Sequence, residues 1–199
     1  EETYDWGKVS KHWAWQPVRK MMPPPIKGAR VVNAIDQFVV VGLHKVRLKQ
    51  PPSARASIFV RRVFLDLIGL PPLPDELEKW TEQLGGNDVA DLNYQAVKAL
   101  VDDLLKRPQY GERWGRHWLD VARYSDTGGW TQDNRAKPSA WQYRDWVVRS
   151  FNEDLPFNDF VRHQIVGDQL GYKAAPGTGF FALGPTYSSD GGDPESTAQ

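Results

Sequence analysis

The residues best suited to chemistry lie in one stretch, 110–130, which reads YGERWGRHWLDVARYSDTGGW. It contains His117, Asp120, Tyr124 and Asp126. An imidazole near a carboxylate and a phenol is suited to general acid–base catalysis, because its ordinary pKa lies close to neutral pH. These four residues are therefore the catalytic candidates, although no reaction follows from them.

Histidine also offers other chemistry. His117 and His163 can contact or ligate a haem iron, and His117 with a nearby carboxylate can hold a metal ion. The alternative is structural, with each imidazole donating to a backbone carbonyl or to a buried acid. His12 and His44 are expected at the surface.

Four aspartates in Gly-rich loops offer oxygen ligands of the kind that calcium prefers: Asp126, Asp133, Asp190 and Asp193. Their spacing matches no EF-hand, so solvated turn acids are the simpler interpretation. A glycosidase pair of carboxylates also stays open among Asp120, Asp126, Asp133 and Asp168, whose separation the sequence does not fix.

Several kinds of site are excluded. The chain has no cysteine, which excludes a thiolate nucleophile, an Fe–S cluster and covalently bound haem c within these residues. It has no Gly-x-Ser-x-Gly elbow, no P-loop and no dinucleotide fingerprint. The chain has 25 basic residues (Lys and Arg) and 25 acidic residues (Asp and Glu), and the basic residues form no stripe. This balance argues against nucleic acid as a partner. No apolar run reaches 18 residues, so no membrane span is expected.

A helix must position the catalytic candidates. Tyr110, Trp114, Val121 and Tyr124 fall on one face of a 3.6-residue period, and His117 lies in the middle of that face. We expect this aromatic face to be buried and the helix to end in the loop at 125–129, where two glycines permit left-handed backbone.

Arginines flank the same region. Arg123, Arg144 and Asp145 are predicted to belong to a buried ion-pair network that pins helices together. Alternatively, the arginines bind a carboxylate or sulfate group of a ligand.

Six further helices are predicted from apolar periodicity, capping residues and Pro or Gly breaks, at residues 34–48, 53–68, 75–84, 93–107, 139–151 and 157–170. The fold class is therefore all-α, with about seven helices around an aromatic-rich core. We divide the chain into an extended N-terminal arm (1–32), a helical domain (33–184) and an irregular tail (185–199). Trp13 and Trp15 are expected to lie extended, on the main body or on a partner.

Five blocks carry a family resemblance: IDQFV (35–39), FVRRVFLDLIGLPPLPDEL (59–77), VDDLLKRPQYGERWGRHWLDVARYSD (101–126), YRDWVVRSFNEDLPFNDFVRHQIVGDQL (143–170) and ALGPT (182–186). In this order they resemble the planctomycete-type cytochrome-associated domain of unknown function (PSCyt type), a module of large secreted proteins. The resemblance covers the chain from about His12 onward.

The resemblance implies export to the periplasm or the extracellular space, but no reaction. It also implies a cytochrome c module upstream and a Cys-x-x-Cys-His-like segment shortly after the equivalent of 184–193. Haem c is thus expected on a partner or on a segment absent from these residues.

Three functions follow as hypotheses. The first is a module of an exported haem-associated redox protein, which scaffolds or contacts a haem-bearing partner and needs an open edge on His117 or His163. The second is a module that binds or degrades a polysaccharide, with Trp130 or Trp141 as a stacking platform beside paired acids. The third is a structural subunit of an extracellular assembly, docked through Trp13 and Trp15.

Overall fold

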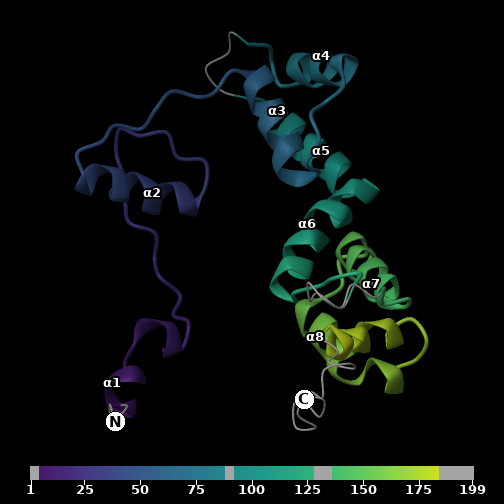
Figure 1. Cartoon of the computed structure of the whole chain (residues 1–199). Coiled ribbons are helices and arrows are strands. Elements are labelled where there is room, and N and C mark those ends of the chain that lie inside the picture. Colours follow the sequence, from purple (N-terminus) through teal and green to yellow (C-terminus); the bar gives the residue numbers. More distant parts are fainter. Residues whose placement is uncertain (1–4, 88–91, 128–135, 184–199) are drawn as a thin grey trace. The chain divides into compact units, whose positions relative to one another are not determined.

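The computed structural model describes residues 5–87, 92–127 and 136–183 (Figure 1). In these ranges the chain forms eight α-helices and three 3-10 helices, and no β-strand. The all-α prediction is confirmed, and the seven helices predicted from the sequence correspond to α2–α8. The chain divides into two compact units, Glu1–Pro52 and Ser53–Gln199, which are described separately.

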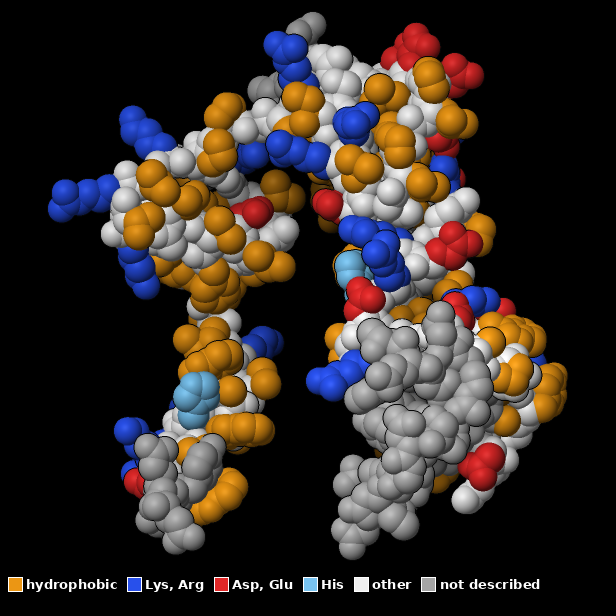
Figure 2. Space-filling view, viewed as in Figure 1, with side chains coloured by type: hydrophobic (Ala, Val, Ile, Leu, Met, Phe, Trp, Pro, Cys, Tyr) orange, Lys and Arg blue, Asp and Glu red, His pale blue; other side chains and the backbone are white. Residues whose placement is uncertain are grey.

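The first unit contains α1 (Trp6–Val9), a 3-10 turn η1 (Trp13–Trp15) and α2 (Ala34–Lys45). Helix α2 starts at Ala34 as predicted, and Asn33 caps it, because its side chain accepts from the backbone N–H groups of Ile35 and Asp36. Val40 is the buried residue of α2. Figure 2 shows hydrophobic side chains gathered over α2 and over the segment that precedes it.

Trp13 and Trp15 differ from the extended backbone that we predicted. They form the short turn η1, whose first N–H groups are partly satisfied by the His12 side chain: Nδ1 accepts from the Ala14 N–H at 3.3 Å. Both tryptophans are exposed. Local side-chain capping therefore decides the conformation of this segment.

The second unit begins with three helices, α3 (Ala56–Leu67), α4 (Pro74–Gln83) and α5 (Tyr94–Leu105). Their apolar faces bury one cluster, made up of Ala56, Val60, Phe64, Ile68, Trp80, Leu84, Leu100 and Leu104. At its edge, Arg107 lies over the Phe64 ring and pairs with Glu76 and Asp103 at 2.7 Å each. The α3 helix starts at Ala56 and not at residue 53 as predicted, and the Ser57 N–H in its first turn donates to Asn87 Oδ1.

A second, aromatic cluster lies among α6 (Pro108–Val121), α7 (Ala140–Asn152), α8 (Phe157–Val166), η2 (Gly167–Gln169) and η3 (Ala175–Ala182). Its buried residues are Tyr143, Trp146, Val147, Phe160 and Leu183. The Phe160 ring stacks on Trp146 and meets Trp118 edge-on, with centroids 4.9 Å apart in both pairs. The predicted aromatic-rich core is therefore present.

Helix α6 runs from the group of α3, α4 and α5 to α7 and α8 (Figure 1). It packs on α7 through two glycines. Gly111 and Gly115 are buried on the face of α6 that meets Val147 and Val148 of α7. A Cβ at Gly111 would lie 2.3 Å from the Val148 carbonyl oxygen. The Gly111 N–H also donates to Asn152 Oδ1 at 2.8 Å, so the backbone of α6 lies directly against α7.

This crossing corrects the predicted orientation of α6. The face with Trp114, His117 and Val121 is exposed, since Trp114 is 37% and Val121 74% accessible. Close packing requires the glycine face to point inward, so the middle of the predicted face turns outward. Its two ends, Tyr110 and Tyr124, are half-buried and pack against the two clusters as expected.

The end of α6 is also earlier than predicted. The helix ends at Val121 and not in the predicted loop 125–129, because Arg123 takes the left-handed conformation (φ 56°). The Tyr124 N–H then donates back to the Leu119 carbonyl at 2.9 Å, which closes the last turn.

Candidate functional site

The first pair of candidates lies on the outer face of α6. His117 is exposed, and its ring meets Trp114 edge-on with centroids 5.6 Å apart. Neither the His117 imidazole nor the Asp120 carboxylate makes a hydrogen bond or ion pair with any residue that the structure describes. The two residues therefore do not form the acid–base pair that their sequence spacing indicated.

Tyr124 and Asp126 are brought together. The Tyr124 hydroxyl donates to Asp126 Oδ1 at 2.6 Å, and Arg144 Nη1 lies 3.9 Å from the same oxygen. Burial, followed by the hydrogen bond to Asp126, raises the pKa of Tyr124 to about 12. The phenol thus stays protonated at neutral pH, and the contact holds the chain where it leaves α6.

The Asp126 backbone fastens the same loop. Its carbonyl accepts from the Lys137 N–H at 2.8 Å, and Thr127 pairs with Ala136 across an isolated antiparallel bridge. These contacts bring the two described ends of the loop together and make a structural role for Asp126 evident.

Among the described residues, Arg123, Arg144 and Asp145 do not form the predicted buried ion-pair network. Arg144 pairs with Asp145 at 3.0 Å, but the side chains are 42% and 53% exposed. Arg123 is exposed at the helix end. Solvent keeps an exposed pair of this kind weak, so it contributes little to stability.

His163 is half-buried on α8, with its ring centroid 6.2 Å from that of Trp146. Its Nδ1 is buried and has no hydrogen-bond partner among the described residues. Its carbonyl packs on Gly177, where an added Cβ would lie 2.8 Å from the oxygen. The residue therefore belongs to the packing of α8 against η3.

Of the four calcium candidates, Asp126 alone is described; Asp133, Asp190 and Asp193 lie outside the described residues. Within the described ranges, no three acidic or histidine side chains are arranged to hold a metal ion. Asp168 is exposed on η2 and makes no side-chain hydrogen bond to a described residue.

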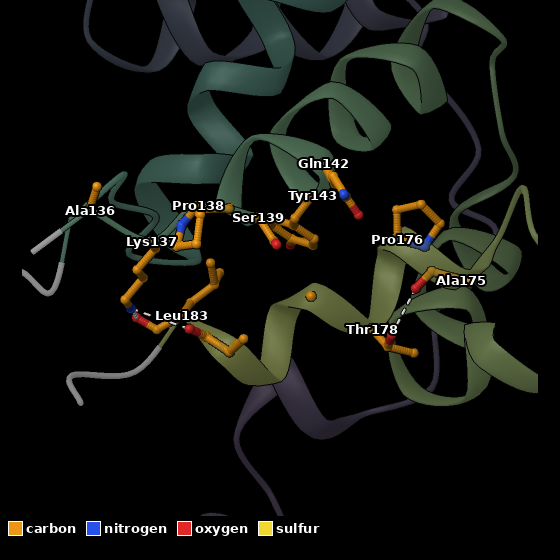
Figure 3. A pocket seen from close by; sticks show the side chains of 13 residues that line it. Ala136, Lys137, Pro138, Ser139, Gln142, Tyr143, Ala175, Pro176, Thr178 and Leu183 are labelled. Carbon is orange, nitrogen blue, oxygen red and sulfur yellow. Dashed lines mark hydrogen bonds between the residues drawn. The ribbon is translucent and has the colours of Figure 1, made fainter. Parts of the chain in front are cut away.

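A pocket of about 670 Å³ opens between the start of α7 and η3 (Figure 3). Lys137 and Leu183 lie at one end, and Pro176 and Thr178 at the other. The Lys137 ammonium donates to the carbonyls of Ala182 and Leu183 at 3.2 and 3.1 Å, at the C-terminal end of η3 where a positive charge is favoured. Small and apolar residues form most of the remaining wall: Ala136, Pro138, Ser139, Ala140, Gln142, Tyr143, Ala175, Gly179 and Ala182.

A chain of hydrogen bonds runs behind this pocket. Trp118 Nε1 donates to the Tyr143 hydroxyl at 2.9 Å, and that hydroxyl donates to Gln164 Oε1 at 2.7 Å. Gln164 Nε2 donates in turn to the Phe160 carbonyl at 3.3 Å. Burial raises the pKa of Tyr143, so the phenol is neutral and its role is to fix α6, α7 and α8 together.

A second groove, of about 620 Å³, lies between α6 and α7. Its charged lining consists of three arginines (Arg116, Arg144 and Arg149) and three acids (Glu112, Asp145 and Glu153). Because the opposite charges are equal in number, this groove does not favour an anion over a cation. The arginine-cluster hypothesis therefore gains no support from it.

Sequence reasoning missed the residues on which the geometry depends. Gly111 and Gly115 carry a signal that could have been used, since they are four residues apart inside a predicted helix. Gln164 carried another, as a polar residue on an apolar helix face. Lys137 and Tyr143 had no signal of their own, because their partners lie 21 or more residues away in sequence.

Fold and site together define an all-α domain with an aromatic core, an apolar pocket and an exposed histidine, and with no converging set of catalytic groups among the described residues. Residues 34–199 match the family described as PSCyt2, protein of unknown function (DUF1549), and the chain belongs to that family. No curated protein and no solved structure matches the chain. Over the described ranges, no helix is both long and apolar enough to cross a membrane.

Proposed function

We propose that this domain is a docking module of an exported haem-associated redox protein, and that it contacts a partner bearing haem c. The observation that carries the proposal is the exposed outer face of α6, by which we mean Trp114, His117 and Val121. The chain itself has no cysteine, so the haem must be attached to other residues.

The outer face has the chemistry that such a partner requires. An exposed haem edge is flat and apolar, and Trp114 and Val121 offer apolar surface beside it. The His117 imidazole makes no hydrogen bond or ion pair with a described residue, so its nitrogens are free of such partners. It can therefore hydrogen-bond to a haem propionate or ligate iron.

The same geometry weighs against catalysis by the predicted residues. His117 and Asp120 have no described polar partner, and Tyr124 and Asp126 hold a loop. A general base needs a neighbouring group that orients it within hydrogen-bond reach. A docking role requires no such group and fits the isolated imidazole better.

The test begins with the natively purified protein, using intact mass and a pyridine haemochrome spectrum. A haem signal on a longer or associated chain is the expected result. In that preparation, His117→Ala should weaken the haem-bearing complex about tenfold, which corresponds to ~1.4 kcal/mol. Because His117 is exposed, the urea midpoint should not change.

His44→Ala provides the matched control, since it removes an exposed histidine from α2. A colourless protein with the mass of these residues alone would overturn the proposal. So would equal complex strength in the His117 and His44 variants, or loss of complex that is accompanied by loss of folding.

A second candidate function, structural docking within an extracellular assembly, is favoured by the first unit. Trp6, Trp13 and Trp15 are 73%, 81% and 71% exposed. Replacing Trp13 and Trp15 with Ala should release the chain from a native assembly in size-exclusion chromatography. Unchanged elution would count against this role.

A polysaccharide role is the remaining alternative. Trp141 is 49% exposed at the start of α7, one turn before Asp145, while Trp130 lies outside the described residues. A glycan array decides the point: binding that is lost in Trp141→Ala would replace the haem proposal with this one.

A further inference from the structure

A third pocket, of about 340 Å³, lies where α6 meets the turn between α7 and α8. None of the residues predicted to be functional lines it. Aromatic side chains form more than half of its lining, which consists of Tyr110, Trp118, Ser150, Phe151, Asp154, Leu155, Pro156, Phe157 and Phe160.

The aromatic side chains lie at different depths. Phe160 is 5% exposed and forms part of the base, where it meets Trp118 and Phe151 edge-on at 4.9 and 6.0 Å between centroids. Phe157 is 70% exposed at the first residue of α8. Aromatic ring faces carry a negative potential that attracts cations, most strongly where the site excludes water.

Asp154 is the one charged residue in this lining. It takes the left-handed conformation (φ 50°) in the turn after α7, where the Leu155 N–H donates to the Ser150 carbonyl at 2.9 Å. This turn fixes the position of the residue. The carboxylate makes no hydrogen bond or ion pair with any residue that the structure describes, so its charge is not neutralised by them.

We propose that this pocket binds an organic cation, an ammonium or guanidinium group. Aromatic rings and an unneutralised carboxylate both favour positive charge, and the lining contains no Lys or Arg to compete for them. The volume is close to the lower end of about 300–1,000 Å³ for ligand pockets, which suits one side chain or a choline-sized group. This site is independent of the outer face of α6.

The experiment titrates the full chain by NMR with choline and with its uncharged carbon isostere, 3,3-dimethylbutan-1-ol. Choline should shift resonances of the pocket, and the isostere should bind at least about fivefold more weakly, as expected when a cation–π contact and a carboxylate both contribute. Arginine methyl ester and an N-acetylated Gly-Arg-Gly amide distinguish a free cation from a partner's side chain. Tighter binding of the ester indicates a free cation as the ligand, and tighter binding of the peptide amide indicates an arginine side chain of a partner.

Three variants make the test specific. Asp154→Asn and Phe157→Ala should each weaken choline binding about fivefold or more, and both positions are exposed, so folding should be preserved. Glu153→Gln is the matched control, because it removes the adjacent exposed acid, which lines the groove between α6 and α7 instead.

Some results would overturn the proposal. Equal binding of choline and its isostere would show an apolar pocket without charge preference. An equal loss in the Glu153 and Asp154 variants would show a general surface-charge effect. If choline did not shift the resonances of the pocket in the wild type, the pocket would not be a cation-binding site.

Discussion

The crossing of α6 and α7 makes a sharp prediction about two glycines in one helix. Gly111 and Gly115 both face α7, yet the space beside them differs. A Cβ at Gly111 would lie 2.3 Å from the Val148 carbonyl oxygen and 2.5 Å from Asn152 Nδ2. At Gly115 the nearest atoms, in Val147 and Val148, are 3.4 Å away, which is ordinary contact. Gly111→Ala should therefore destabilise the protein, whereas Gly115→Ala should not.

The magnitude follows from three effects. Helix propensity favours Ala over Gly by about 1 kcal/mol at either position. At Gly111, overpacking against backbone costs about 1–3 kcal/mol, because a carbonyl cannot rotate away as a side chain can. Displacing Asn152, which bonds the Gly111 N–H and the Pro108 carbonyl, costs about 1 kcal/mol more. We expect a net loss of about 1–3 kcal/mol for Gly111→Ala and a gain of up to about 1 kcal/mol for Gly115→Ala.

Urea unfolding of the full chain, followed by circular dichroism at the helix band, measures both values. The two variants share a helix, a substitution and a helix-propensity gain, so their difference measures the contacts of residue 111 with Val148 and Asn152. Equal stability of the two variants would refute the reasoning. A stable Gly111→Ala would show that α6 and α7 separate at little cost.

Three further predictions rest on the same unit. Arg123→Gly should raise the free energy of unfolding by about 1 kcal/mol, since glycine adopts a φ of 56° without strain. Arg116→Gly, inside α6, should lower it by about 1 kcal/mol. If urea unfolding gave the reverse order of stability, the assigned helix end would be contradicted. Tyr143→Phe should cost about 1–3 kcal/mol because Trp118 and Gln164 lose their partner, and Tyr143→Phe with Gln164→Leu should cost less than the sum of the single changes. Tyr124 should ionise near pH 12 in a phenolate absorbance titration compared with Tyr124→Phe. Since an unfolded tyrosine ionises near pH ~10, its contribution to stability should be complete below that pH and be lost as the pH rises to about 12; an unshifted titration in the wild type would rule out the contact with Asp126.

Periodicity and capping were sufficient for the helices. Asn33 and Asn93 cap α2 and α5 because a short polar side chain satisfies the first N–H groups locally. Pro74 opens α4, where its missing N–H costs nothing. These signals are local in sequence, so they predict a helix without knowledge of the tertiary fold.

Helix ends and orientations were harder to predict because they depend on distant contacts. Glycines at 128–129 indicated a stop, but α6 ends earlier, at Val121, because Arg123 is left-handed although its residue type carries no such preference. Arg47 and Asp154 end α2 and α7 in the same conformation, each followed by a leucine whose N–H closes the turn. An apolar residue after the turn was the available signal at these two positions.

The candidate residues were chosen for their chemistry, and chemistry alone did not reveal which of them would meet. Tyr124 and Asp126 are two residues apart, and a local turn joins them. His117 and Asp120 are three apart on a helix, yet neither has a described polar partner. Tyr143 and Gln164 were not candidates, although the fold joins them across 21 residues.

The two faces of α6 explain why the aromatic pattern misled. A helix that packs closely through glycines needs fewer bulky apolar residues on its buried side. Trp118 of α6 still packs in the aromatic cluster, but Trp114 and Val121 stay exposed around His117 on the outer side. Burying that face on folding would have stabilised the domain by about 25 cal/mol per Å² of apolar area. The domain does without this energy, and a partner that covers the face would recover it, which is the physical reason to look for one there.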